Sequence, residues 1–110
     1  MFTIVVILRK RPEVSTEEFR RVWKTEYAPL YRKIPQVKSY EQLHLIDRRK
    51  DESEDPIDGI AVMSFESEDA MKEAWATSTY QEAAKIRESI MRETAVGVHV
   101  ASLFERVQII

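Results

Sequence analysis

Three aromatic side chains at helical spacing are the first residues of this sequence that suggest a binding site. Trp23, Tyr27 and Tyr31 follow one another at intervals of four, which places them on one side of a helix. Such a stripe is an aromatic wall with a phenol donor, suited to a small apolar ligand. The alternative is ordinary core packing, because aromatic stripes on helices usually face a core. We name Tyr27 as a candidate catalytic residue, and Trp23 and Tyr31 as candidate substrate-binding residues.

The two histidines, His44 and His99, are the best candidates for general acid–base catalysis, because imidazole titrates near neutral pH. His44 lies on an expected edge strand, close to Tyr40, which we add to the substrate-binding candidates. His99 lies on a strand that we expect inside the sheet, on the same alternation as Ala101. For each histidine the alternative is a core or surface group without a catalytic role.

Two charged residues stand at expected strand ends. Arg9 follows the first apolar run and can hold an anionic group of a substrate, although a solvated strand end explains it equally. Asp58 precedes Gly59 and is better explained as a turn residue than as a catalytic carboxylate. Only Arg9 therefore joins the substrate-binding candidates.

Composition excludes several classes of chemistry. The chain has no cysteine, which excludes disulfides, thiolate metal sites and a cysteine nucleophile, and fits the cytoplasm, where we expect the protein. Its two glycines form no phosphate-binding or dinucleotide motif. No cluster of ligands has metal spacing, so we expect neither metal nor cofactor; haem ligation by one histidine stays open. A net charge of -2 favours neither nucleic acid nor an anionic membrane as a partner.

The pattern of apolar residues predicts one domain over residues 1–110, with strands at 2–8, 37–46, 58–65 and 98–105. Ser15 and Ser67 have the sequence context of helix N-caps. We expect Pro29 to break or kink the first helix, and the second helical region to be interrupted near 77–79 before it resumes over 80–92. The order β-α-β-β-α-β predicts a ferredoxin-like α+β fold, with a four-stranded antiparallel sheet and two helices on one face.

The predicted strands at 2–8, 58–65 and 98–105 are apolar on both faces. Helices on one side would leave several hundred Å² of apolar surface in water, more than monomers usually expose. A second copy packed sheet against sheet would cover this surface. We therefore expect a homodimer through the sheet face, and an apolar tail at 107–110 that extends a strand.

Three blocks of the sequence resemble the EthD family. Residues 15–30, STEEFRRVWKTEYAPL, are similar to its S-x-E-E-F-x-x-x-W-x-x-x-H-A-P-L signature. Residues 34–40, IPQVKSY, resemble its L-P-G-x-x-x-Y segment, and residues 58–71 resemble its D-G-x-A block and the F-x-S-x-E-x-M that follows. The resemblance implies a dimeric α/β barrel. Proteins of this family are associated with the degradation of ethers and aromatic compounds and are loosely classed with oxidoreductases.

The resemblance leaves two functions open. One is a cofactor-independent oxidoreductase, isomerase or cyclase in catabolism, acting on a small hydrophobic or aromatic compound. The other is a non-catalytic ligand-binding or accessory module on the same barrel. The histidine that precedes Ala-Pro-Leu in the family is Tyr27 here. A phenol, with a pKa of about 10 against about 6.5 for imidazole, donates hydrogen bonds but is a poor base near neutral pH.

Overall fold

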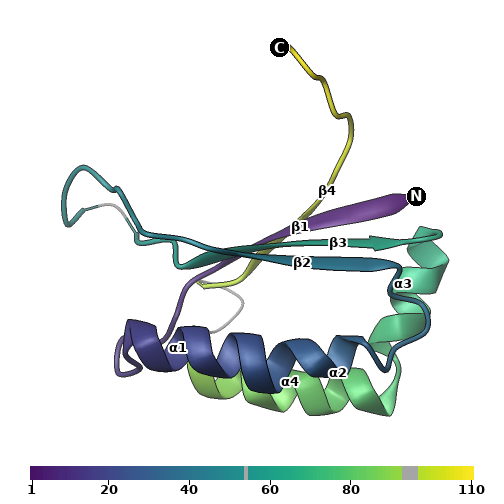
Figure 1. The fold of residues 1–110 in the computed structure, drawn as a ribbon, viewed down its shortest axis with the longest axis horizontal. Helices are drawn as coiled ribbons and strands as arrows, with labels where there is room; N and C mark the ends of the chain where they lie inside the picture. Colours follow the sequence, from purple (N-terminus) through teal and green to yellow (C-terminus); the bar gives the residue numbers. More distant parts are fainter. Residues whose placement is uncertain (54, 93–96) are drawn as a thin grey trace.

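The computed structural model describes residues 1–53, 55–92 and 97–110. Four strands and two helical regions alternate along the chain in the predicted order (Figure 1). The elements are β1 (Phe2–Leu8), α1 (Thr16–Val22), the π-helical turn η1 (Trp23–Tyr27), α2 (Ala28–Tyr31), β2 (Ser39–His44), β3 (Gly59–Phe65), α3 (Glu68–Trp75), α4 (Ser78–Ile90) and β4 (His99–Ser102). In the described parts of the chain, no helix is long and apolar enough to cross a membrane.

The four strands form one antiparallel sheet in the order β2-β3-β1-β4. Figure 1 shows the helices together on one side of this sheet. The ferredoxin-like fold expected from the sequence is therefore confirmed, and so is the edge position of β2. The expectation that the last strand lies inside the sheet is wrong, because β4 pairs only with β1 and forms the other edge.

Both predicted N-cap residues form N-cap hydrogen bonds. The Ser15 hydroxyl accepts a hydrogen bond from the Glu18 backbone N–H at 3.1 Å, and the Ser67 hydroxyl accepts one from Ala70 at 3.1 Å. The interruption expected near 77–79 is a third cap, in which the Thr77 hydroxyl accepts from the Tyr80 N–H at 3.1 Å. The caps explain why the helical segments begin where they do.

The first helical region does not break at Pro29. It widens before the proline into the π-helical turn η1, where the Ala28 N–H donates to the Trp23 carbonyl five residues back. A proline inside a regular α-helix removes a hydrogen bond and collides with the preceding turn. The wider register of η1 accommodates that defect, so the helix continues to Tyr31.

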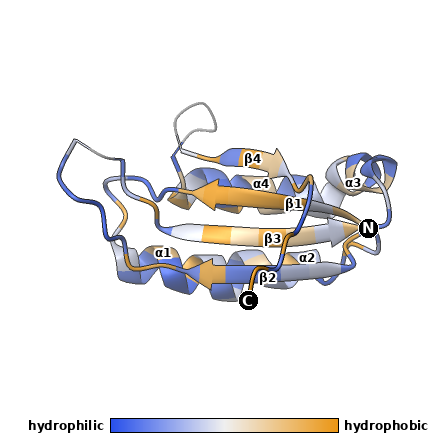
Figure 2. Ribbon diagram, turned by 90° about the horizontal axis from the view of Figure 1, so that it is seen from above, coloured by the Kyte–Doolittle hydropathy of each residue, from blue (hydrophilic) through white to orange (hydrophobic). Residues whose placement is uncertain are grey.

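No described helix covers the other face of the sheet, which lies away from α1, α2, α3 and α4 (Figure 1). Strand pairing aligns Leu43, Ile60, Ile7 and His99 in one row across it, and Glu41, Val62, Val5 and Ala101 in the next. We call this surface the open face. Seen from above in Figure 2, its central strands β1 and β3 are largely hydrophobic.

The C-terminal tail, residues 103–110, leaves the sheet on the side of the open face (Figure 1). Its first backbone N–H, of Leu103, still donates to the Thr3 carbonyl at 2.8 Å. Beyond that point the tail does not continue β4, contrary to expectation, and Phe104 and Ile110 are 99% and 108% exposed. A long apolar segment therefore extends into solvent.

Candidate functional site

A small cavity lies between the helices and the sheet, where the sequence places the aromatic stripe. Its walls combine aromatic side chains from both helical regions and from β2 with aliphatic side chains of the sheet. We call it the aromatic cavity and define it by Trp23, Tyr27, Tyr31, Tyr40, Trp75, Tyr80 and Arg87. Ile4, Val6, Leu8, Ala61 and Met63 of β1 and β3 also line it.

The free volume of the aromatic cavity is about 50 Å³. A benzene-sized ligand occupies a cavity of about 150 Å³, so a ring enters only when side chains move. The candidates to move are Trp75, Tyr80 and Arg87, which are half-buried, whereas Trp23, Tyr27 and Tyr31 are fully buried. Val100 of β4, which also lines the cavity, is exposed, so the mouth of the cavity lies near α4, the end of α3 and β4.

Tyr27 and Tyr31 form a pair deep in this cavity. Their hydroxyl oxygens are 2.5 Å apart and their ring centroids 5.1 Å apart. Burial raises the pKa of Tyr27 above its ordinary value, and burial together with the neighbouring Tyr27 raises the pKa of Tyr31. Both phenols therefore stay protonated at neutral pH and act as hydrogen-bond donors, not as bases.

Tyr40 belongs to a second hydrogen-bonded group with Gln42 and His44, the other two residues on its face of β2. The Gln42 amide nitrogen donates to the Tyr40 hydroxyl at 2.8 Å and to the Trp23 carbonyl at 2.9 Å. The Gln42 carbonyl oxygen is then left to accept from His44 Nε2, 3.0 Å away. Because Tyr40 accepts from Gln42, its own O–H proton remains available for a ligand oxygen. Burial raises the pKa of Tyr40.

His44 itself packs against the outer side of Trp23, with 4.7 Å between ring centroids. Partial burial and the nearby cations Lys24 and Arg20 lower the pKa of His44 below its ordinary value. The imidazole is thus neutral at pH 7. It contacts Trp23 of the cavity wall and is hydrogen-bonded to Gln42, but it does not itself line the cavity.

Arg87 is the residue of this site that sequence reasoning missed. Its guanidinium donates to the Tyr80 hydroxyl at 3.1 Å and lies 5.6 Å from the centre of that ring. Partial burial lowers the pKa of Arg87, but the Tyr80 hydrogen bond and the surrounding phenols outweigh it, so the net pKa is raised. Among the described residues it forms no ion pair. Its seven-residue spacing from Tyr80, two turns of α4, was the available signal.

One more buried donor faces this region. The Trp23 side chain is fully buried, and its indole Nε1 has no hydrogen-bond partner among the residues described. The indole is near the Tyr40 hydroxyl, where it slightly opposes the rise in the pKa of that phenol. An unpartnered buried N–H costs free energy that a ligand oxygen can recover.

The remaining candidates lie elsewhere. His99 pairs with Ile7 and therefore faces the open face, opposite to Val6 and Leu8, which line the aromatic cavity. Arg9 follows β1 and is absent from the lining of that cavity; its carbonyl accepts from the Arg92 N–H at 3.0 Å. Asp58 does not form the expected turn: its N–H donates to the Leu8 carbonyl at 3.0 Å, and its carboxylate accepts from the distant Lys10 N–H at 2.9 Å.

This chain resembles several solved structures of the same fold. An EthD family protein from Bacillus halodurans has a TM-score of 0.74 at 17% identity, covering 96% of this chain and 100% of its own. A dimeric protein of ferredoxin-like fold and unknown function from Bacteroides fragilis has a TM-score of 0.68 at 17% identity, covering 93% of each chain. SnoaB, a cofactor-independent oxygenase from Streptomyces nogalater, has a TM-score of 0.67 at 16% identity, covering 97% and 94%.

The comparison with curated proteins found no match to this sequence. The model of the EthD domain, by contrast, matches residues 11–90. This stretch begins before α1 and ends with α4, so it includes the helices and strands that build the aromatic cavity, apart from β1 and β4. The chain therefore belongs to the EthD family.

Proposed function

We propose that this EthD-family protein binds a small hydrophobic or aromatic compound in the aromatic cavity and transforms it without a cofactor, as an oxidoreductase, isomerase or cyclase in catabolism. The observation that carries the proposal is the half-buried Arg87, a cation without an ion pair among the described residues, in a cavity whose described lining contains no carboxylate. A cation in such surroundings favours a ligand that carries or develops negative charge on oxygen.

The phenols would stabilise the same negative charge on the ligand oxygen. Loss of a proton from a phenol or an enolisable carbonyl compound gives an electron-rich anion that can rearrange, cyclise or react with O₂ directly. In this proposal Tyr27 and Tyr40 donate hydrogen bonds to the anionic oxygen, and Arg87 supplies the opposite charge. Trp23 and Tyr31 hold the ring, while His44 fixes Gln42. The resemblance of the fold to SnoaB is compatible with cofactor-free oxygen chemistry.

A non-catalytic ligand-binding module is the second candidate, and one observation favours it. The described residues that line the aromatic cavity include no group that accepts a proton near neutral pH, because the phenols stay protonated and Arg87 stays charged. Position 27 holds tyrosine in place of the family's histidine. A substrate that is already anionic would still bind, but its deprotonation by the protein would be slow.

Native mass spectrometry against a panel of aromatic and enolisable compounds, followed by turnover assays on each hit, separates the two candidates. Arg87→Gln should weaken binding of an acidic hit by about tenfold, the loss expected for one charge-assisted hydrogen bond. Lys72→Gln, on the exposed side of α3, is the matched control. Binding with turnover supports the enzyme and binding without turnover the module. An Arg87→Gln variant that binds like the wild type contradicts both.

We also infer that the protein is a homodimer built through the open face. The apolar side chains of Val5, Ile7, Ile60 and Val62 are only half-buried in the protomer, and the described helices lie on the other face of the sheet. A solved protein of the same fold, from Bacteroides fragilis, is dimeric. Packing of two open faces about a two-fold axis would bury both sets of rows and leave the mouth of each aromatic cavity, near α4, accessible.

A further inference from the structure

A second hollow lies on the outside of the molecule, between the first helical region and the edge strand β2. It has a volume of about 430 Å³, within the range of small-molecule sites. We call it the basic groove and define it by Lys24, Arg32, Lys38, Tyr31, Tyr40 and Gln42. We propose that the basic groove, a site separate from the aromatic cavity, binds a small aromatic carboxylate.

The charge of the groove is the first argument. Three cations line it, and its described lining contains no aspartate or glutamate, although the whole chain has a net charge of -2. Lys24 and Arg32 form no ion pair with the described residues, whereas the Lys38 ammonium donates to the Pro35 carbonyl at 3.3 Å and lies 3.9 Å from the Glu66 carboxylate. An anion placed in the groove would therefore meet cations without a competing carboxylate in the described lining.

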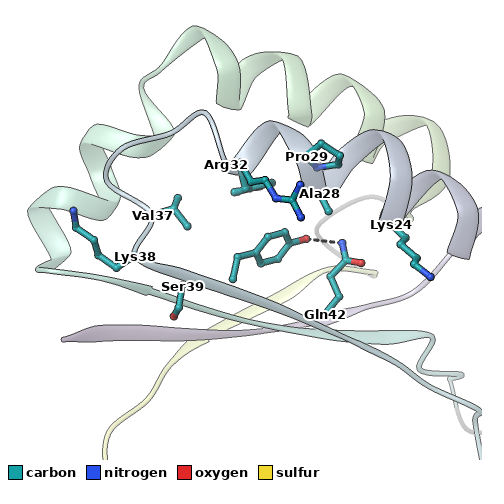
Figure 3. Close-up of a pocket in the computed structure, with 10 residues that line it drawn as sticks. Lys24, Ala28, Pro29, Arg32, Val37, Lys38, Ser39 and Gln42 are labelled. Carbon is teal, nitrogen blue, oxygen red and sulfur yellow. Dashed lines mark hydrogen bonds between the residues drawn. The ribbon is translucent and has the colours of Figure 1, made fainter.

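The geometry of the helix is the second argument. Lys24, Ala28 and Arg32 are spaced by four residues; Lys24 lies within the wide turn η1, and Ala28 begins α2. Residues four apart lie on one side of a helix, so these three positions follow the side of the helical region that lines the groove. Figure 3 shows the Arg32 guanidinium directed into the groove, toward the Gln42 amide on the opposite wall.

The apolar part of the groove favours an aromatic ring as the remainder of the ligand. Ala28, Pro29 and Val37 complete the lining, and the rings of Tyr31 and Tyr40, 4.7 Å between centroids, form the inner wall. A flat ring can stack there while its carboxylate reaches Arg32, whose planar guanidinium suits a carboxylate. Charge alone would suit inorganic phosphate equally, so the apolar wall is what favours the aromatic acid.

The basic groove shares Tyr31 and Tyr40 with the aromatic cavity, but the cations belong to the groove alone. Arg87 lines only the cavity. Substitutions of Arg32 and of Arg87 therefore report on different sites. A failure of this proposal would leave the function proposed for the cavity untouched.

The test uses benzoate as the probe, with benzamide as a neutral ligand of the same shape, followed by NMR of the labelled protein. We expect benzoate to shift the backbone resonances of Lys24, Arg32 and Gln42 and to bind at least about tenfold more tightly than benzamide, since the charge difference is worth a charged hydrogen bond or more. Arg32→Gln should weaken benzoate binding about tenfold. Lys33→Gln, an exposed neighbour outside the lining, should leave it unchanged.

Several results would overturn the proposal. Equal affinity for benzoate and benzamide would show that the cations do not select the ligand. Loss of benzoate binding in Arg87→Gln but not in Arg32→Gln would place the acid in the aromatic cavity. Phosphate binding as tight as benzoate would show a bare anion site. An acidic peptide that shifts the whole outer edge of β2, where benzoate shifts nothing, would make the groove a protein-binding edge.

Discussion

Gly59 lies directly against the indole of Trp23, and a Cβ at position 59 would come within 2.7 Å of both Cζ3 and Cη2 of that ring. The contact joins the start of β3 to the first turn of η1. These residues belong to two of the sequence blocks that resemble the family, the Trp-containing block and the Asp-Gly block. The lack of a side chain at Gly59 is thus what lets the wall of the aromatic cavity reach the sheet.

Gly59→Ala should lower the free energy of unfolding by about 1–3 kcal/mol, the usual cost of overpacking a tight core. Urea denaturation measures it. Trp23→Phe shortens the ring that the added Cβ at position 59 would meet. The double variant should therefore lose less unfolding free energy than the two single variants lose together. Additivity within about 0.5 kcal/mol would contradict the contact.

The hydroxyl pair of Tyr27 and Tyr31 gives a second coupled prediction. Tyr31→Phe should destabilise the protein by about 1–2 kcal/mol, because it leaves the buried Tyr27 hydroxyl without its partner. The double variant Tyr27→Phe/Tyr31→Phe should lose less than the sum of the single variants, since no orphaned hydroxyl remains. Denaturation curves of the three variants test this, and strictly additive losses would show that the hydroxyls do not depend on each other.

Much of the fold could be predicted because local rules agreed with the global topology. Ser15 and Ser67 cap helices as their sequence context indicates. The helix through Pro29 could not be predicted, because the π-helical turn that accommodates the proline depends on packing of Trp23 and Tyr27 against the sheet. Strand order was equally hidden: periodicity shows that the last strand is apolar on both faces, but not that it lies at an edge.

Only part of the candidate site could be predicted from the sequence. The stripe of Trp23, Tyr27 and Tyr31 faces the cavity as its spacing indicates, and Tyr40 meets it from β2. Arg87 was missed because an arginine on a helix is usually solvated, and only the three-dimensional approach of α4 to the phenols takes it out of water. His99 was placed on the correct alternation, with Ala101, but that alternation faces away from the helices.

The environment of His44 predicts its titration. Partial burial and the cations Lys24 and Arg20 lower its pKa, so an NMR titration of the imidazole should give a value below the ordinary 6.5. Since the unfolded state then binds the proton more tightly, the contribution of His44 to stability is present above pH 6.5 and is lost as the pH falls toward the folded pKa. Lys24→Gln should move the pKa upward, and Lys33→Gln should not. An unchanged value in Lys24→Gln would contradict the electrostatic cause.

The buried phenols predict alkaline unfolding. Tyr27, Tyr31 and Tyr40 have pKa values raised above 10.0 by burial, so their contribution to stability is complete below pH 10 and is lost as the pH rises through the folded values. Tyrosinate absorbance should therefore rise together with the loss of circular dichroism above pH 10. Ionisation of all four tyrosines at pH 10 without unfolding would show that the phenols are accessible to water.

The C-terminal tail offers a test of the dimer that does not disturb the protomer. Phe104, Ile109 and Ile110 are almost fully exposed in one chain, so a chain ending at Leu103 keeps its hydrogen bond to Thr3 and should unfold at the same urea concentration as the full chain. If the tail packs on the second protomer, each large apolar side chain buried there contributes about 1.5–3 kcal/mol.

Truncation should then weaken dimerisation by at least about tenfold, measured by analytical ultracentrifugation over a range of concentrations. Lys72→Gln on α3, which lies on the helical side, is the control that should leave the dimer unchanged. A truncated chain that dimerises as tightly as the full chain would show that the partner does not bury the tail. A full-length chain that stays monomeric at micromolar concentration would remove the open face as an interface altogether, because its exposed apolar rows would then be stable in water.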